Sequence, residues 1–386
     1  MGLYQDLSVA GRRWLATRGK ERPTTAAERE REELRRWSSA SASALQEAGA
    51  ASTALVEIDA KALPWTDTGI DLAPGDEVST FAAGRVVLSD PLDVWVGPQF
   101  QLWMRIGERG DAFNGAAATH SFAAPAGGRL YLAGYFPGQW GDRAGRVSTS
   151  LRDYAGARGG LTVLVVRWKG PASAAVRALA ATAAGPAQAE RERLEQPLEV
   201  PHGWEHLWFL GQSRIFRQEQ VDGRTCIACR THGDVSILQR DAVLDLEPGT
   251  RVAWDWKVEA LPSTLREDTM LSHDYLSVAV EFENGRDLTY TWSAALPEGT
   301  GYWCPLPTWK DREFHVVVRS GAEGLGRWLH EERDLFEDYR RLIGPPPRRV
   351  VRVWLIAVSL FQRLPGSALV AGLELRDAAG VRHPVG

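Results

Sequence analysis

The residues best suited to acid–base chemistry lie in the C-terminal half of the chain. His273 and Asp274 are adjacent, just before an apolar strand-like segment, and Asp255 lies in an earlier segment of the same kind. A histidine beside carboxylates can transfer protons if the two strands adjoin. Polar residues at the ends of strands more often form turns. Asp255, His273 and Asp274 are therefore candidates for a second site, and both interpretations remain open.

Two other carboxylates, Glu281 and Glu283, lie two residues apart in a strand pattern and therefore on one face. Paired carboxylates cleave glycosidic bonds when they flank the bond, but glutamates on a solvated face are much commoner. The chain has no phosphate-binding loop, dinucleotide fingerprint, zinc-protease motif or nucleophile elbow. The sequence therefore favours binding over catalysis and names no catalytic residue.

The cysteines and histidines do not form a recognisable metal-binding motif. Cys226 and Cys229 make a lone CxxC, and a zinc site needs two further ligands at a regular spacing. Only Cys304 and eight histidines without paired spacing are available. Residues 225–229 are instead typical of a buried strand, in which a free cysteine packs as a small apolar side chain. We expect neither a metal site nor a cofactor.

Length and composition indicate two globular domains. With 386 residues, 44% of them hydrophobic, the chain is too long for a single core and too apolar to be disordered. A net charge of −4 disfavours nucleic acid as the main partner, because phosphate-binding surfaces are basic. No apolar run reaches the length of a membrane span. Residues 1–20 lack the apolar stretch of a secretory signal, so a cytoplasmic location is expected, with leaderless export left open.

The first 52 residues predict two helices. One apolar stripe with four-three-four spacing consists of Leu3, Leu7, Ala10 and Trp14. Thr25 and Glu28 form a capping box that predicts the start of a second helix, which extends to about residue 48. The two helices could form a hairpin that packs on a β domain or on another subunit. Self-association through residues 1–50 is therefore one hypothesis.

Residues 53–170 and 201–386 have the short, regularly punctuated apolar segments of β domains. The clearest strands of the first region are 55–58, 77–82, 102–106, 129–132 and 161–168, with a weaker one at 121–123. Residues 171–200 are rich in alanine and are interpreted as a linker with a short helix. The predicted fold is mainly β: two β-sandwich, jelly-roll-like domains that follow an N-terminal helical segment.

Alternation in the second region predicts which side chains face inward. Val252, Trp254, Trp256 and Val258 should point to one side of a strand, and Asp255 and Lys257 to the other. Most of the 16 tryptophans are expected in such cores, although an indole ring also stacks on flat ligands. Segments 275–282 and 288–293 flank Asn284-Gly285, which predicts a hairpin. A helix is expected over 334–342, with Asp334 and Glu337 as its capping pair.

An ordered series of short motifs runs through the first β region. It consists of Trp65-Thr66-Asp67-Thr68-Gly69-Ile70, Pro74-Gly75-Asp76, Ala82-Ala83-Gly84, Gly97-Pro98, Met104-Arg105-Ile106-Gly107 and Pro137-Gly138-Gln139-Trp140-Gly141-Asp142-Arg143-Ala144-Gly145. In this order and spacing, most of residues 53–169 resemble the galactose-binding PA-I type lectins of bacteria. The resemblance implies a small jelly-roll-like sandwich in which a calcium ion holds sugar hydroxyls.

The calcium loop of these lectins is altered in this chain. Tyr135 stands where the family has an acidic residue, and Asp142 and Arg143 stand where it has two asparagines. The carbonyls of Gln139 and Leu88 could match ligands of the family's ion, but Tyr135 is a poor ligand and Arg143 brings a positive charge. We expect no tight calcium site unless other oxygens, such as those of Asp90 or Asp93, complete one.

The altered loop has two interpretations. It is either a plain β-turn, in which glycines adopt positive φ, or a metal-free binding loop. On the second interpretation, the candidate ligand-binding residues are Tyr135, Gln139, Trp140, Asp142 and Arg143.

Residues 204–376 resemble a bacterial family known only as domain of unknown function 3047. The resemblance rests on Trp254-Asp255-Trp256-Lys257-Val258, Leu261-Pro262, His273-Asp274-Tyr275, Leu288-Thr289-Tyr290-Thr291-Trp292-Ser293, Glu332-Arg333-Asp334-Leu335 and Asp338-Tyr339-Arg340-Arg341. The family often has paired acids in place of His273-Asp274. It usually has an Asp- and Asn-rich stretch in place of Ser359-Leu360-Phe361-Gln362, so a polar site there is expected to be lost. The family implies no activity.

Together these features predict a noncatalytic binding protein with a degenerate lectin-like domain, whose partner is a glycan, a polysaccharide or another small ligand. The first alternative is an enzyme that acts on a carbohydrate or a hydrophobic metabolite at a site between the domains. The second alternative is a scaffold that docks through its N-terminal helices.

Overall fold

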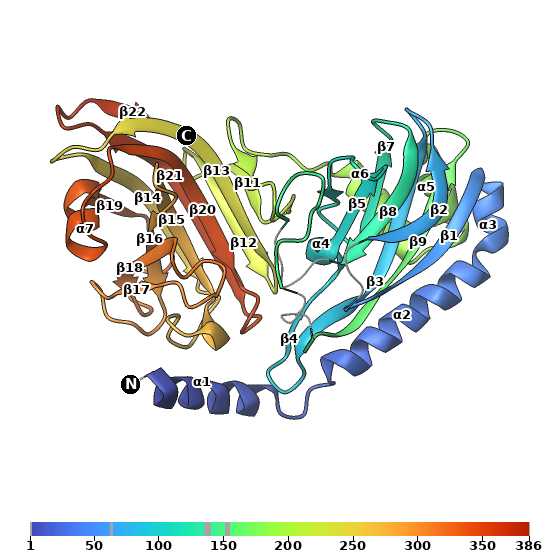
Figure 1. Ribbon diagram of the computed structural model, residues 1–386, viewed down its shortest axis with the longest axis horizontal. Helices are drawn as coiled ribbons and strands as arrows, with labels where there is room; N and C mark the ends of the chain where they lie inside the picture. Colours follow the sequence, from blue (N-terminus) through green and yellow to red (C-terminus); the bar gives the residue numbers. More distant parts are fainter. Residues whose placement is uncertain (1, 62–64, 135–139, 151–154, 386) are drawn as a thin grey trace. The chain divides into compact units, whose positions relative to one another are not determined.

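The computed structural model describes residues 2–61, 65–134, 140–150 and 155–385. The chain is mainly β and divides into two units, which we call the N-terminal and the C-terminal β domain (Figure 1). The N-terminal β domain comprises Thr17–Leu198 and Trp208–Arg214. The C-terminal β domain comprises Met1–Ala16, Glu199–Leu207 and Ile215–Gly386. No helix in the described ranges is long and apolar enough to cross a membrane.

The N-terminal β domain is a sandwich of two antiparallel sheets. One has the order β1-β9-β3-β4, with β7 paired to β3, and the other has the order β2-β8-β5-β6. The strands are β1 (Ala50–Asp59), β2 (Thr66–Leu72), β3 (Glu77–Ser89), β4 (Val94–Val96), β5 (Leu102–Ile106), β6 (Phe113–Asn114), β7 (Thr119–Ala123), β8 (Gly128–Gly134) and β9 (Arg158–Trp168). Alternate apolar side chains of both sheets fill the core. The strands predicted for this region are confirmed.

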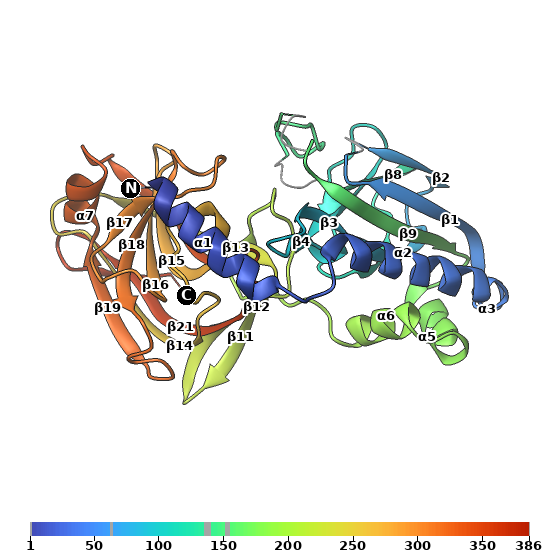
Figure 2. The same cartoon turned by 90° about the horizontal axis from the view of Figure 1, so that it is seen from below.

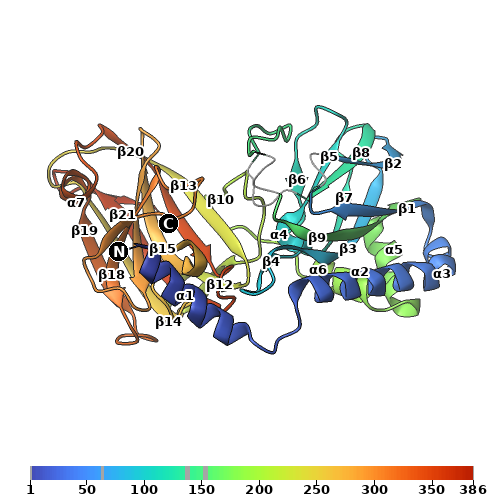
Figure 3. The ribbon, with the colours of Figure 1, turned by 60° about the horizontal axis from the view of Figure 1, so that its bottom comes forward.

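Helices cover the face of the five-stranded sheet that points away from this core (Figures 1 and 3). They are α2 (Pro23–Ala40), α3 (Ala42–Glu47), α5 (Ala172–Thr182) and α6 (Pro186–Glu195). Leu34 and Leu179 pack there against Phe81 and Trp168 in a second apolar cluster. Segment 171–200, interpreted above as a linker, therefore contains two helices whose apolar sides join this cluster.

Helix α2 begins two residues before the predicted capping box. Pro23 occupies its first turn, where the missing N–H of proline needs no partner, and Arg22 holds the N-cap position. The prediction of Thr25 as the cap is therefore wrong. The neighbouring Thr24 donates from its backbone N and its Oγ1 to the carboxylate of Asp90, at 2.9 Å each, which fixes the start of the helix on the loop after β3.

Helix α1 (Gly2–Thr17), labelled in Figure 2, groups with the C-terminal β domain, whereas α2 groups with the N-terminal β domain. Its predicted apolar stripe is not its buried face, since Leu7 is 62% and Trp14 48% exposed. The buried positions are Val9 and Arg13, and the Arg13 guanidinium donates to a backbone carbonyl of that domain. Helical periodicity identifies an apolar stripe but not the surface that covers it. Self-association through these helices stays a prediction.

The C-terminal β domain is a second sandwich. One sheet has the order β10-β13-β20-β15-β16-β18-β17, and the other has the order β11-β12-β21-β14-β19, with β22 paired to β21. The strands of the seven-stranded sheet are β10 (Glu205–His206), β13 (Val235–Asp245), β15 (Tyr275–Phe282), β16 (Asp287–Ser293), β17 (Gly301–Trp303), β18 (Glu313–Ser320) and β20 (Arg349–Val358). Those of the six-stranded sheet are β11 (Phe216–Val221), β12 (Arg224–His232), β14 (Arg251–Ala260), β19 (Leu329–Asp334), β21 (Pro365–Arg376) and β22 (Arg382–Pro384).

Tryptophans dominate the core of this second sandwich. Trp254 and Trp256 of β14 are buried between the two sheets with Trp292 of β16, as the alternation predicts. Asp255 lies between the first two on the opposite face of β14. The predicted hairpin is confirmed, because β15 and β16 pair on either side of Asn284-Gly285.

The remaining elements are short helices. Helix α7 (Leu335–Leu342) is confirmed together with its cap, since the Asp334 carboxylate accepts from the backbone N of Glu337 at 2.9 Å. Two single turns, α4 (Pro98–Gln101) and η2 (Met270–Ser272), precede β5 and β15.

The CxxC pair lies in β12, which is a buried strand as predicted. Cys226 and Cys229 are both buried and carry free thiols. Cys229 belongs to the sandwich core, whereas Cys226 belongs to a small cluster on the outer face of the six-stranded sheet. Residues three apart on a strand point to opposite faces, so these two sulfurs cannot bind one metal ion.

Candidate functional site

The loop expected to bind a ligand is described from residue 140 onward, and Tyr135 and Gln139 lie outside the described residues. A bridge between Trp140 and Val147 closes the described part. Inside it, the Asp142 carboxylate accepts from the backbone N and the Nε of Arg146, both at 3.1 Å. The side chains of Asp142 and Arg146 remain 47% and 65% exposed. With the exposed Arg143, they form what we call the polar rim.

Four tryptophans gather beside this loop and form what we call the indole cluster: Trp65, Trp103, Trp140 and Trp208. Trp65 and Trp140 are stacked with ring centroids 5.0 Å apart, and Trp103 meets Trp140 edge to face at 5.8 Å. Trp65 Nε1 donates to the carbonyl of Gly145 at 3.1 Å, which ties the loop to the cluster. Gly145 has φ +75°, and a Cβ there would lie 2.4 Å from the Trp65 ring, so this turn requires glycine.

Trp140, the aromatic residue expected to contact a ligand, is only 3% exposed. Its ring is enclosed by its tryptophan neighbours, so in this structure it supports the cluster from inside. The half-buried rings of the cluster are Trp65 and Trp208. Arginines cover part of each ring: the Arg105 guanidinium lies 4.5 Å from the Trp65 centroid, and that of Arg143 lies 5.4 Å from Trp208.

Trp208 is held at the cluster by a buried asparagine. Asn114 donates from Nδ2 to the carbonyl of Gln212 at 3.1 Å, and its Oδ1 accepts from the backbone N of Gln212 at 2.7 Å. This clamp joins the segment Trp208–Arg214 to the end of β6. No sequence pattern predicted it, because the two partners lie 98 residues apart.

The residues proposed as a second site are not all brought together. Asp255 lies on the outer face of the six-stranded sheet, where it accepts from Arg224 at 2.7 Å and pairs with His330 at 2.8 Å. Trp328, under the Arg224 guanidinium at 5.0 Å, extends this surface. His273 and Asp274 precede β15 in the other sheet and are completely buried. The acid–base cluster that required adjoining strands does not form.

Asp274 holds a turn of the chain. Its carboxylate accepts from the backbone N of Phe361, at 2.8 Å, and from that of Gln362. Burial raises the pKa of Asp274 to about 6. The Gln362 side chain donates in turn to Ser263 and to the carbonyl of Ser272. The segment at which a polar site was expected to be lost is therefore part of a buried hydrogen-bond network, and the loss of a site there stays a prediction.

The outer face of the seven-stranded sheet is polar and yet buried. Along its strands, every second side chain, such as Tyr290 and Phe314, points inward and belongs to the sandwich core. The opposite face, which we call the buried polar face, comprises Tyr275, Ser277, Asp287, Thr289, Thr291, Ser293, Glu313 and His315, each less than 9% exposed. Glu267 joins it from the preceding loop, accepting from Ser293 Oγ and from the backbone N of Ala294. Burial raises the pKa of Glu267 to about 7.

His273, Cys304, Glu313 and His315 meet on this face. One possible ligand atom from each of the four lies within 4.8 Å of the others. Cys304 Sγ is 3.2 Å from His273 Nε2, and Glu313 Oε1 is 3.5 Å from His315 Nε2. Burial lowers the pKa of His273 to about 3 and raises the pKa of the Cys304 thiol. Two of the histidines that were expected to offer no metal cluster therefore lie in a group that could hold a metal ion.

The sequence gives one weak signal for this group. Glu313 and His315 alternate on a strand and so share a face, and Cys304 lies nine residues earlier. His273 joins only because β15 and β18 both flank β16 in the sheet. The pair Glu281 and Glu283, in contrast, has structural partners: Arg352 donates to Glu281 at 2.9 Å, and the backbone N of Arg348 donates to Glu283 at 2.9 Å.

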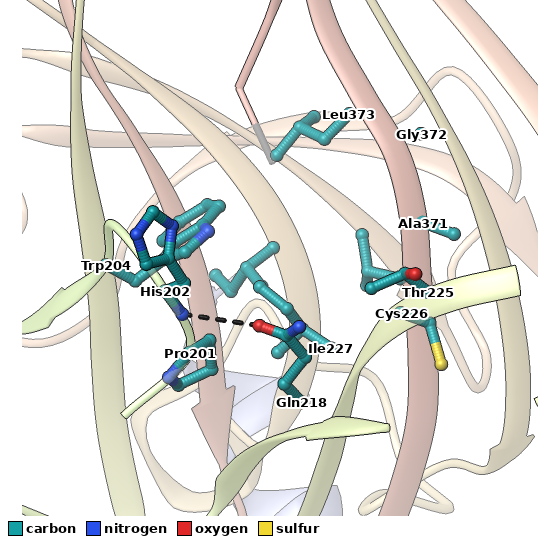
Figure 4. A pocket seen from close by; sticks show the side chains of 12 residues that line it. Pro201, His202, Trp204, Gln218, Thr225, Cys226, Ile227, Ala371, Gly372 and Leu373 are labelled. Carbon is teal, nitrogen blue, oxygen red and sulfur yellow. Dashed lines mark hydrogen bonds between the residues drawn. The ribbon is translucent and has the colours of Figure 1, made fainter. Parts of the chain in front are cut away.

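Three hollows of the C-terminal β domain have linings without Asp255, His273 or Asp274. In the smallest, about 60 Å³, Figure 4 shows Trp204 and Ile227 with Gln218, which accepts from the backbone N of His202 at 3.3 Å. Ligand sites usually measure about 300 Å³ or more, so this one has room for water only. Two open hollows measure about 590 and 540 Å³; α1 and segment 264–266 border the first, and residues 199–202 and 218–220 the second.

The family comparison bears out the resemblance of the C-terminal region. Residues 202–374 match the model of a family described as protein of unknown function (DUF3047). No curated protein matches the chain.

Several solved structures of carbohydrate-binding proteins resemble parts of the chain. The N-terminal domain of EclA, a PllA-like lectin, is 19% identical over 30% of this chain and 95% of its own, with a TM-score of 0.23. TmCBM61 in complex with β-1,4-galactotriose is 10% identical over 47% and 90%, with a TM-score of 0.24. The xyloglucanase domain of NopAA from Sinorhizobium fredii, in complex with cellobiose, is 4% identical over 48% and 95%, with a TM-score of 0.28.

Proposed function

We propose that this protein binds a glycan at the indole cluster and the polar rim of its N-terminal β domain, without acting on it chemically. The observation that carries the proposal is the meeting of two partly buried indoles, Trp65 and Trp208, with the exposed charges of Asp142, Arg143 and Arg146. An indole face packs against the apolar face of a sugar ring, and fixed polar groups bind its hydroxyls. Trp208 is the ring suited to this packing, because Trp65 is stacked on Trp140 at 5.0 Å and has the Arg105 guanidinium 4.5 Å from its centroid. The motif resemblance to galactose-binding lectins, which ends in this same loop, supports the same ligand class.

The enzyme alternative has less support. His273 and Asp274 are completely buried, and the hollows described above have other linings. A general acid or base must come within hydrogen-bond reach of its substrate. The scaffold alternative, docking through the N-terminal helices, stays a prediction.

A screen of the full chain on immobilised glycans tests the proposal, followed by calorimetry with the best ligand. Asp142→Asn should weaken binding about tenfold or more, since one charge-assisted hydrogen bond contributes about 1.5–3 kcal/mol. Trp208→Ala should also weaken binding about tenfold or more, because the ring that packs on the sugar is lost. Asp71→Asn is the matched control: this 72% exposed carboxylate also pairs with an arginine, Arg129, in the same domain. The affinity of the Asp71→Asn variant for the glycan should stay within about twofold of the wild type, because the loss of this surface ion pair changes the stability of the domain little. Absence of binding to any glycan would refute the proposal.

Calcium should have no effect on this binding. The Asp142 carboxylate is already paired with Arg146, and the neighbouring Arg143 would repel a divalent ion about 4 Å away by several kcal/mol. The other candidate carboxylates are engaged as well: Asp90 accepts from Thr24, and Asp93 from Trp95 Nε1 at 2.9 Å.

We therefore expect that millimolar calcium does not raise the melting temperature and that a chelator does not abolish glycan binding. An ion that binds only the folded state must stabilise it by mass action. A calcium-dependent rise of several degrees in the melting temperature would contradict this expectation. It would instead favour the mechanism of the lectins, in which a calcium ion holds the sugar hydroxyls.

A further inference from the structure

The four-residue group on the buried polar face has the donors of a transition-metal site. Two imidazoles, one thiol and one carboxylate converge from three segments: the loop before β15, the residue after β17, and β18. Histidine, cysteine and carboxylate are the ligands of protein-bound zinc. Calcium and magnesium take oxygen ligands, so a thiolate and two imidazoles exclude them.

The distances fit four-coordinate binding. Bonds of about 2.0–2.3 Å to a tetrahedral zinc ion place neighbouring ligand atoms about 3.3–3.8 Å apart. The Cys304–His273 separation of 3.2 Å and the Glu313–His315 separation of 3.5 Å are close to that range. The largest separation in the group, within 4.8 Å, closes with a movement of about 1 Å.

The surroundings orient the ligand atoms inward. His273 Nδ1 lies 2.6 Å from the carbonyl of Glu267, so this nitrogen carries the proton and the Nε2 lone pair faces Cys304. Tyr275 donates from its hydroxyl to Glu313 Oε1 at 2.6 Å, which fixes the carboxylate. Such hydrogen bonds are the usual second layer around metal-bound histidines and carboxylates.

A second observation points to a missing partner. His315 is completely buried, and neither of its ring nitrogens makes a regular hydrogen bond among the described residues, although Nε2 lies 3.5 Å from Glu313 Oε1. Its ring is held between Tyr302, stacked at 4.8 Å, and Tyr275, edge-on at 4.7 Å. Without a metal, Cys304 and His273 can share one S–H···N bond and His315 Nε2 has Glu313 Oε1 at 3.5 Å, but His315 Nδ1 is left without a hydrogen-bond partner, which is rare for a buried polar atom.

We propose that His273, Cys304, Glu313 and His315 bind one divalent transition-metal ion, with zinc the best match. A thiolate and a carboxylate neutralise its two positive charges, so the complex carries no net charge inside the domain. Four protein ligands leave no open position, so the ion has a structural role: it ties the loop before β15 and the segment after β17 to β18. The proposal does not depend on glycan binding, which is placed in the other domain.

The test uses the full chain without an affinity tag. After production in zinc-supplemented medium, mass spectrometry of the metals should find about one zinc ion per chain. After production with cobalt in place of zinc, the protein should show the visible bands of tetrahedral cobalt and a near-ultraviolet thiolate-to-cobalt band. The proposal would be overturned if the purified protein contained less than about a tenth of an equivalent of metal and showed none of these bands.

Variants assign the ligands. Cys304→Ser should lose the thiolate-to-cobalt band and most of the bound metal, with a melting temperature several degrees lower. Cys229→Ser is the matched control, a buried thiol in the same domain but outside the group, and should keep both signals. If Cys304→Ser does not fold, the same measurements are made on His315→Gln, which should lose most of the bound metal that the wild type contains. A folded Cys304→Ser variant that keeps the thiolate-to-cobalt band would refute the site.

Discussion

Replacing Trp254 by alanine should destabilise the C-terminal β domain by about 3–5 kcal/mol, the usual cost of truncating a buried tryptophan. Trp254 is completely buried between the two sheets. Its ring meets Trp256 edge to face and lies against Tyr290, both with centroids 5.6 Å away. Alanine would leave a cavity that the strands of two sheets cannot close, because each is held in register by its neighbours.

Trp328→Ala is the matched control for this variant. Trp328 immediately precedes β19 and packs on the outer face of the same six-stranded sheet, where it is partly buried and donates to Asp222 at 3.0 Å. Trp328→Ala should lower the free energy of unfolding of this domain by about 1 kcal/mol. Hydrogen exchange at increasing urea, read on peptides of β14–β16, reports the stability of this domain alone. Equal losses in the two variants would mean that β14 does not face the core as described.

Replacing Gly84 by alanine should destabilise the N-terminal β domain by about 3 kcal/mol or more. Gly84 has φ +110°, and a Cβ there would lie 2.3 Å from the carbonyl oxygen of Gly160 and 2.8 Å from the side chain of Arg31. The oxygen belongs to the backbone of β9 and cannot rotate away. The substitution therefore separates β3 from β9 at the centre of the five-stranded sheet, next to α2.

Gly75→Ala separates the steric effect from that of the dihedral angle. Gly75 has a similar left-handed conformation, φ +84°, but open space around the missing Cβ. It should cost about 1 kcal/mol, the difference expected when a residue with a side chain is forced to positive φ. Exchange measured on peptides of β3 and β9 compares the two variants. A Gly84→Ala variant no less stable than Gly75→Ala would contradict the close approach of the two strands.

The fold could be predicted where local patterns carry the information. Alternation placed Trp254 and Trp256 inside and Asp255 outside, and Asn284-Gly285 located a hairpin. The patterns failed where burial depends on distant partners. The stripe with Leu7 and Trp14 is a real helical face, but α1 turns Val9 and Arg13 inward instead. Thr289 and Thr291 alternate with the core residues of β16, a pattern typical of a solvated outer face, yet both are completely buried.

The candidate sites depend even more on topology. The loop at Asp142 could be identified from its motifs, but the clamp between Asn114 and Gln212, which brings Trp208 to it, could not. The group around His273 was missed for the same reason, since its members have no regular spacing in the sequence. They meet because β16 and β18 pair in parallel, which requires a long connection, and Cys304 lies within that connection.

The central claim, that a glycan binds at the indole cluster, is tested most directly by nuclear magnetic resonance of the tryptophan side chains. The indole N–H signals are assigned by single Trp→Phe variants, and the glycan with the strongest signal in the screen is then added. The signals of Trp65 and Trp208 should shift in proportion to occupancy, because their rings are the partly exposed members of the cluster. The signals of Trp254, Trp256 and Trp292, in the core of the other domain, should stay in place. Shifts confined to the C-terminal β domain, or none at saturating glycan, would contradict the proposed binding site.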